Sequence, residues 1–153
     1  MLLLFFQANE QSYALEISCV EEVVPFVSLR PLPEAPRGVA GLMNYRGSVL
    51  PVVDLSAWLG GPPARNRLST RLAIIQADAP EGASYRLALL VEGATETREV
   101  AAASLHPSGV VHETLPCLGD VLVEGEALAQ VIDPNRLLTD ALKAVLAPVG
   151  RGV

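Results

Sequence analysis

Three potential metal ligands lie close together in the second half of the sequence. His106, His112 and Cys117 fall within a span of twelve residues. Imidazole and thiolate groups are common zinc ligands, and three of them can hold a catalytic ion. Their spacing matches no common zinc pattern, however, and no Cys-x-x-Cys pair accompanies them. We therefore expect three ordinary loop residues, and we predict neither a metal ion nor a cofactor.

Acidic side chains are the second group that could do chemistry. Asp54 and Glu92 each follow an apolar run, and aspartate at such a place is expected to cap a turn. Glu21 and Glu22 are adjacent, and adjacent side chains of a strand point to opposite faces, so they are not expected to work as an acid–base pair. No Gly-x-Ser-x-Gly, His-Glu-x-x-His or phosphate-binding glycine loop is present. We predict no catalytic residue, and a hydrolase or metal-binding enzyme remains a minor alternative.

The charge and the apolar segments restrict the partners and the location. The formal net charge is −6 and the 11 basic residues are scattered, whereas a nucleic-acid binder carries a basic stripe. The opening MLLLFF lacks the features of a signal peptide, and no stretch approaches the ~18 apolar residues of a spanning helix. We expect a cytoplasmic protein that binds no nucleic acid and does not insert into a membrane. Cys19 and Cys117 could form one disulfide, but two free thiols fit that compartment better.

Short strands are the elements that would position these residues. Tyr13, Leu15 and Ile17 alternate with other residues, which is the period of a strand. Pro25 would place its strand at the edge of a sheet. Similar apolar runs recur, separated by segments rich in glycine and proline. The expected strands cover residues 2–7, 12–17, 20–27, 39–45, 49–55, 71–77, 85–91, 95–100, 117–123 and 127–132.

Two further segments organise the chain. Residues 60–66, GGPPARN, form the clearest linker and suggest two units. Residues 136–146 show apolar residues at helical spacing, and Asp133 and Pro134 suit the start of that helix. Many short strands with a single terminal helix favour a mainly β fold made of small barrels.

One segment is more specific than the rest. Residues 38–55, GVAGLMNYRGSVLPVVDL, resemble the CheW family, in which an Asn-x-Arg-Gly turn precedes an apolar strand that ends in Pro-Val-Val-Asp-Leu. Residues 13–23, 88–93 and 128–138 are similar to further family segments, in the same order. The match spans nearly the whole chain. The short N-terminus and the segment around Pro36-Arg37-Gly38 also look like the variant coupling proteins of Wsp-type surface-sensing systems.

The resemblance implies a fold and a function. The fold would be mainly β, with two packed five-stranded SH3-like β-barrels and a C-terminal helix, and residues 1–153 would form a single CheW-like domain. The first barrel would cover residues 14–66 and the second residues 67–132, with strand 2–7 and helix 134–147 packing across both. The function would be that of a chemotaxis coupling protein in two-component signal transduction, a scaffold without enzymatic activity.

The partners follow from the same resemblance. They would be the regulatory domain of a CheA-type histidine kinase and the cytoplasmic tip of a chemoreceptor. The alternative is a CheW-like module with another regulatory partner, such as a diguanylate-cyclase or motility regulator, because a fold does not determine a function.

The resemblance also assigns candidate sites. A receptor tip is a helical hairpin, and such helices need an apolar trough, which is expected between the barrels. The residues assigned to receptor binding are Glu22, Gly41, Met43, Asn44, Arg46, Gly47, Ile75, Val91 and Ala94. The residues assigned to kinase binding are Leu4, Ile17 and Val20. Some of the apolar residues could instead be core.

The turn Asn44-Tyr45-Arg46-Gly47 has a physical interpretation of its own. Gly47 can take a positive φ, and the Asn44 side chain can satisfy backbone groups of the turn. By the resemblance, Arg46 is expected to pair with Glu22 and to shape the binding surface. An ordinary hairpin turn with a solvated arginine is the alternative.

Overall fold

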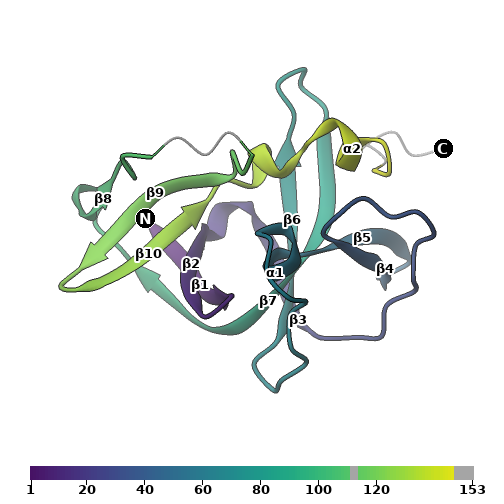
Figure 1. The fold of residues 1–153 in the computed structure, drawn as a ribbon, viewed down its shortest axis with the longest axis horizontal. Helices are drawn as coiled ribbons and strands as arrows, with labels where there is room; N and C mark the ends of the chain where they lie inside the picture. The colour runs from purple at the N-terminus through teal and green to yellow at the C-terminus, as the bar shows by residue number, and fades with distance from the viewer. Residues whose placement is uncertain (111–113, 147–153) are drawn as a thin grey trace.

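The structure is a computed structural model, and it describes residues 1–110 and 114–146. This part of the chain forms two small β-barrels with short helical turns between the strands (Figure 1). The strands are β1 (Leu2–Ala8), β2 (Gln11–Glu16), β3 (Val20–Pro25), β4 (Val39–Tyr45), β5 (Ser48–Asp54), β6 (Arg71–Asp78), β7 (Ser84–Glu99), β8 (Leu105–His106), β9 (Leu118–Glu124) and β10 (Ala127–Ile132). The helical elements are η1 (Ile17–Cys19), α1 (Leu55–Trp58), η2 (Ala102–Ser104), η3 (Pro134–Leu137) and α2 (Asp140–Lys143).

The first barrel contains β3, β6, the first half of β7, β5 and β4, in that order of pairing. A bridge between Arg30 and Leu42 brings the loop after β3 against β4 and closes this barrel. The second barrel contains the last part of β7, then β1, β2, β10 and β9, and the short β8 pairs with β9. Figure 1 shows β4 and β5 on the right and β8, β9 and β10 on the left. The expected fold of two packed SH3-like barrels is confirmed.

Strand β7 belongs to both barrels, which differs from the two separate strands expected over 85–91 and 95–100. Val91 pairs with Arg71 of β6, and Thr97 pairs with Leu4 of β1. Between these pairs Gly93 takes a φ of 61°, which a glycine adopts without steric cost and which bends the strand. The two expected strands are therefore one long strand with a bend at Gly93.

The barrels also do not divide at residues 66 and 67. Strand β3 pairs with β6 across that point, and β5 pairs with β7, so strands from both expected halves share the first barrel. The linker 60–66 connects two strands of one barrel. The expected border is corrected for this reason, because a Pro/Gly-rich segment marks a loop but not which strands pair on its two sides.

The expected helix over 134–147 is broken in two. Asp133 caps η3 by accepting a hydrogen bond from Asn135 N at 3.1 Å, with Pro134 in the first turn, as predicted. Leu138 then leaves the helical region, and Thr139 caps α2 by accepting from Leu142 N at 3.2 Å. Threonine is a preferred N-cap residue, so it starts a second helix instead of continuing the first. Residue 147 lies outside the described residues.

The hydrophobic core of the described residues consists of three apolar clusters. The cluster inside the first barrel contains Met43, Tyr45, Leu50, Val52, Leu72, Ile74, Ala88 and Leu90. The cluster inside the second barrel contains Leu3, Ala14, Val100, Leu122 and Ala129. The largest cluster combines residues of β1 and β2 with residues of β5, β6 and β7 and with the C-terminal turns, so it packs the two barrels against each other.

Candidate functional site

The β4–β5 hairpin places the most specific sequence motif at the surface. Arg46 and Gly47 are its two loop residues, with φ values of 51° and 86°, as a two-residue type I′ turn requires. The Asn44 Oδ1 atom accepts a hydrogen bond from Gly47 N at 2.9 Å. The predicted roles of Asn44 and Gly47 in the turn are confirmed.

Arg46 pairs with Glu22, as the family resemblance implied, and is not the solvated arginine of the alternative. Its Nη2 atom lies 2.7 Å from Glu22 Oε1, and the Arg46 and Glu22 side chains are 72% and 35% exposed. An ion pair this exposed stabilises a fold by at most about 1 kcal/mol. The pair therefore contributes mainly to the shape and charge of the surface.

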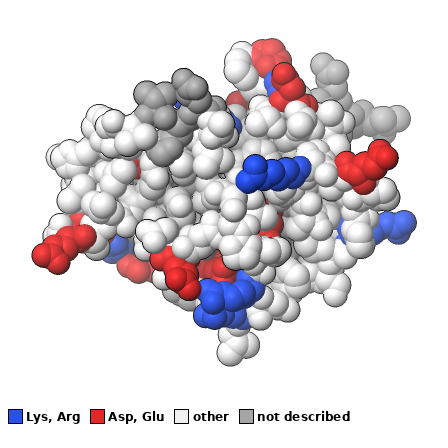
Figure 2. Space-filling model, in the orientation of Figure 1, with Lys and Arg blue, Asp and Glu red and all other residues white. Residues whose placement is uncertain are grey.

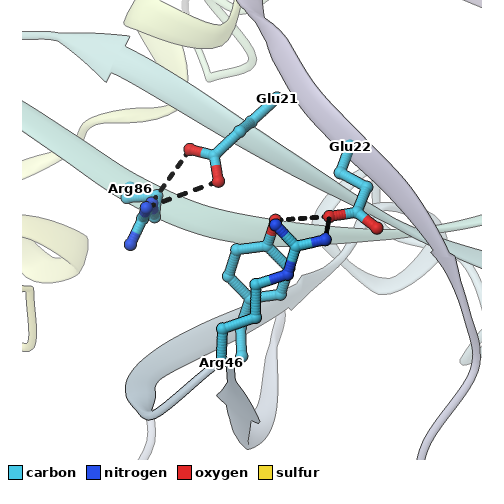
Figure 3. Close-up of polar contacts among 5 residues, drawn as sticks. Glu21, Glu22, Arg46 and Arg86 are labelled. Atoms are coloured by element: carbon cyan, nitrogen blue, oxygen red, sulfur yellow. Dashed lines mark hydrogen bonds and ion pairs between the residues drawn. The ribbon is translucent and has the colours of Figure 1, made fainter.

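Three neighbouring side chains enlarge this pair into a network that sequence reasoning missed. The Tyr45 hydroxyl donates to the same Oε1 atom of Glu22 at 2.6 Å. Arg86 of β7 donates from Nε and Nη2 to Glu21 at 3.2 and 3.3 Å (Figure 3). We call Glu21, Glu22, Tyr45, Arg46 and Arg86 the tyrosine cluster. Arg86 gave no sequence signal, because its place depends on strand pairing.

A bulge in β3 explains how two adjacent glutamates reach one cluster. Val20 pairs with Ile75 and Glu22 pairs with Ile74, so Glu21 is an extra residue on its strand. Such a bulge interrupts the alternation of side chains. The expectation that Glu21 and Glu22 point to opposite faces was wrong for this reason, and the close view shows both carboxylates beside the arginines (Figure 3).

Tyr45 lies at the centre of the cluster. Its ring centroid is 5.2 Å from the Arg46 guanidinium carbon and 5.6 Å from that of Arg86, which is the range of cation–π contacts. The hydrogen bond to Glu22 raises the pKa of the Tyr45 hydroxyl to about 12. The hydroxyl therefore keeps its proton near neutral pH and acts as a donor.

The apolar residues assigned to the trough between the barrels lie in the core. Met43 is 5% exposed, Ile75 is 0% exposed and Val91 is 1% exposed. Ile75 and Val91 belong to the cluster between the barrels, against which the half-buried Ala94 also packs. This part of the inter-barrel space is filled by side chains, so these residues support the surface from below. Gly41 is buried too, with its α-carbon turned to the Arg30 carbonyl.

The residues assigned to the kinase fall into two groups. Leu4 is 3% exposed and belongs to the core between the barrels. Ile17 in η1 and Val20 at the start of β3 are half-buried. The two residues between them, Ser18 and Cys19, line a hollow of about 500 Å³. Only Ile17 and Val20 reach a surface that a partner could contact.

The candidate catalytic carboxylates have structural partners. Asp54 caps α1: its Oδ1 atom accepts from Ala57 N at 3.3 Å and its Oδ2 atom accepts from Ala64 N at 2.9 Å. The capping prediction is therefore confirmed. Glu92 accepts a hydrogen bond from Arg65 Nε at 3.1 Å.

The candidate metal ligands do not form a described cluster. His106 is exposed in β8, Cys117 is fully buried, and His112 lies outside the described residues. Within residues 1–110 and 114–146, no group of three or more His, Cys, Asp or Glu residues is placed to hold a metal ion. Cys19 and Cys117 are free thiols, and burial raises the pKa of each to about 11.

On the face drawn in Figure 2, much of the surface is neutral, the charged side chains are scattered with one basic side chain near the middle, and the basic groups do not form a stripe. Among the helices that the structure describes, none is long and apolar enough to cross a membrane.

The two barrels and the exposed hairpin define a class of protein: a small module of two packed β-barrels. The chain belongs to the family of CheW-like domains, whose model matches residues 2–142. The resemblance to the CheW family is thereby confirmed, and the resemblance to Wsp-type coupling proteins stays a prediction.

Individual relatives agree with this assignment. The chain is 33% identical to the chemotaxis protein CheW of Rhizobium meliloti over 106 residues, which are 69% of this chain and 65% of that protein. The match thus spans less than two thirds of that relative. The chain is 25% identical to the chemotaxis protein CheW of Bacillus subtilis over 141 residues, covering 89% of this chain and 85% of that one. The crystal structure of the scaffolding protein TtCheW from Thermoanaerobacter tengcongensis has the same fold, with a TM-score of 0.80, 23% identity and coverage of 95% and 93%.

Proposed function

We propose that the protein is a chemosensory coupling protein, which joins the regulatory domain of a CheA-type histidine kinase to the cytoplasmic tip of a chemoreceptor. It would act in the cytoplasm, by attachment alone and without a cofactor. The observation that supports this function most directly is the exposed Arg46–Glu22 pair, held on a preorganised hairpin in a chain of the CheW-like family. Preorganised groups bind with a smaller loss of conformational freedom.

The receptor side of the proposal uses the exposed residues of the assigned set. Glu22, Asn44, Arg46 and Gly47 lie at or beside the β4–β5 turn. Gly41, Met43, Ile75 and Val91 would act indirectly, by supporting the strands from which these groups project, and Ala94 would lie at the margin. A scaffold transmits a signal only if its contacts differ between the receptor's two states.

The kinase side of the proposal uses Ile17 and Val20 as contacts and Leu4 as their support. Ile17 belongs to η1 and Val20 begins β3, whereas the receptor residues are Glu22, two positions further along β3, and the residues of the β4–β5 turn. The function requires that one molecule hold both partners at once. Each contact can be weak, because simultaneous binding raises the effective concentration of the second partner.

A reconstitution tests this function. The receptor tip and the kinase regulatory domain are mixed with and without the protein, and complex formation is followed by analytical ultracentrifugation. We expect a ternary complex only when the protein is present. Absence of binding to both partners at tens of micromolar would overturn the proposal and favour a CheW-like module with a different regulatory partner.

A further inference from the structure

The Tyr45 hydroxyl and the Arg46 guanidinium bind one and the same oxygen. Glu22 Oε1 accepts from Tyr45 at 2.6 Å and lies 2.7 Å from Arg46 Nη2. A carboxylate oxygen held by one hydrogen bond and one ion pair has little freedom to turn, because turning would weaken both interactions. The Tyr45 hydroxyl therefore restrains the Glu22 carboxylate, and this carboxylate in turn restrains the Arg46 guanidinium.

The Tyr45 ring adds a second restraint. It faces the Arg46 guanidinium at 5.2 Å and the Arg86 guanidinium at 5.6 Å. Arg86 is in turn held by two hydrogen bonds to Glu21. One tyrosine thus joins two ion pairs into a single unit that connects β3, β4 and β7 with the hairpin turn (Figure 3).

Such restraints matter for a long side chain at the surface. Arg46 is 72% exposed, and an arginine side chain that moves freely in solution loses rotamer entropy when a partner fixes it. A partner that meets an already fixed guanidinium avoids part of this cost. Only Nη2 of Arg46 has a partner in the described residues, so other donors of the same group are open to an acceptor from outside.

We propose that Tyr45 is a positioning residue for partner binding: through Glu22 and its ring it holds Arg46 in the orientation that the receptor tip recognises. This proposal rests on the proposed function for the identity of the partner. Tyr45 itself is only 5% exposed, so it acts through Arg46 and not by touching the partner.

The test compares Tyr45→Phe with Tyr85→Phe. Both variants lose one hydroxyl group and keep the ring. Tyr85 is 7% exposed and packs in the core between the barrels, a different apolar cluster from that of Tyr45, although it precedes Arg86 along β7. Binding of the receptor tip is measured by isothermal titration, and the free energy of unfolding is measured by denaturant titration. We expect Tyr45→Phe to weaken binding about tenfold, the value of one hydrogen bond to a charged group, whereas Tyr85→Phe leaves binding unchanged.

A double-mutant cycle separates positioning from a general structural effect. If Tyr45 acts through Arg46, Tyr45→Phe has no further effect on binding in a protein that already carries Arg46→Gln. An equal loss in both backgrounds, or no loss in the single variant, would overturn the proposal. A loss of binding that merely follows a loss of stability would overturn it as well.

A measurement without any partner keeps this inference distinct from the proposed function. Relaxation of the Arg46 Nε–H signal in ¹⁵N NMR reports how firmly the guanidinium is held. We expect greater motion in Tyr45→Phe than in the wild type and in Tyr85→Phe. If the wild type bound no receptor tip but showed this difference, the proposed function would fail while the hold on Arg46 stood. Unchanged motion would overturn the positioning role even if receptor binding were normal.

Discussion

Arg46 of the first barrel and Arg98 of the second each lie over an aromatic ring and pair with glutamate, as Arg86 also does, yet Arg46 and Arg98 differ in how much of the side chain they leave exposed. Arg98 of β7 lies 4.4 Å from the centre of the Phe5 ring. Its Nε atom donates to Glu96 at 2.9 Å, its Nη2 atom donates to Glu124 at 2.7 Å, and its Nη1 atom also reaches Glu124. All three nitrogens of this guanidinium are occupied within the chain.

Arg46 in the first barrel differs because most of its side chain is exposed; we call it the open arginine and Arg98 the closed arginine. One nitrogen pairs with Glu22, and the side chain is 72% exposed against 37% for Arg98. Arg98 connects β7 to the end of β9, whereas Arg46 stands on a turn. An ion pair with an aromatic neighbour therefore does not by itself mark a binding surface. Under the proposed function, the guanidinium donors of Arg46 that have no partner in the described residues distinguish it from Arg98.

Charge reversal gives the largest expected difference between the two arginines. Arg46→Glu places a third carboxylate beside Glu21 and Glu22, and we expect receptor-tip affinity to fall about a hundredfold, because like charges at an interface cost several kcal/mol. Arg98→Glu, the matched control, is expected to leave affinity unchanged. Isothermal titration measures both. Equal losses in the two variants would remove the distinction between the open and the closed arginine, and global unfolding of Arg46→Glu would show a structural role instead.

The support beneath the hairpin gives the next largest effect. At Gly41 the φ is 152°, and an added β-carbon would lie 2.5 Å from the Arg30 carbonyl oxygen. Because that oxygen belongs to the bridge with Leu42 that closes the first barrel, it cannot move away easily. We expect Gly41→Ala to lower the free energy of unfolding by about 2 kcal/mol, as measured by denaturant titration. Gly47→Ala, with open space around the glycine, should cost less.

Loss of the Arg98 side chain is expected to lower the stability of the fold without changing the affinity for a partner. Arg98→Gln removes the bonds to Glu96 and Glu124 and the contact with Phe5. We expect only a small fall in the free energy of unfolding, because the Arg98 side chain is more than a third exposed and solvent screens its ion pairs. Thermal unfolding followed by circular dichroism measures the change. A loss of partner affinity at unchanged stability would contradict the assignment of Arg98 to structure.

The smallest expected effect is on how the free energy of unfolding depends on pH in the acid range. The hydrogen bond from Arg98 lowers the pKa of Glu124 below its ordinary value of 4.5. A carboxylate with a lowered pKa stabilises the fold above 4.5, and this contribution is lost as the pH falls through the lowered pKa. We expect unfolding free energy to fall less steeply below pH 4.5 in Arg98→Gln than in the wild type. Parallel curves for the two proteins would show that the pair is not formed in solution.

The barrel fold and the hairpin were predictable because their signals are local. A two-residue period marked the strands, and Asn44, Arg46 and Gly47 stood together in one motif. The Arg46–Glu22 pair came from the resemblance, since 24 positions separate the two residues and no local pattern connects them.

The parts that sequence reasoning missed depend on pairing between distant strands. Arg86 reaches Glu21 only because β3, β6 and β7 are neighbours. The extra residue in β3 also follows from its register against β6. Met43, Ile75 and Val91 were expected at a surface, but apolar side chains are usually buried. Met43 is enclosed within the first barrel, and Ile75 and Val91 lie in the core between the two barrels.

Because both barrels share β7, the chain cannot be divided into two fragments that each contain a whole barrel. Any cut within residues 84–99 deprives one barrel or the other of a strand, and a cut at the linker 60–66 separates β3 from β6. Neither half is a self-sufficient unit, so the two barrels should melt in one transition. The continuous backbone of β7 then sets the distance and the angle between the two barrels, and so between any partners bound to them.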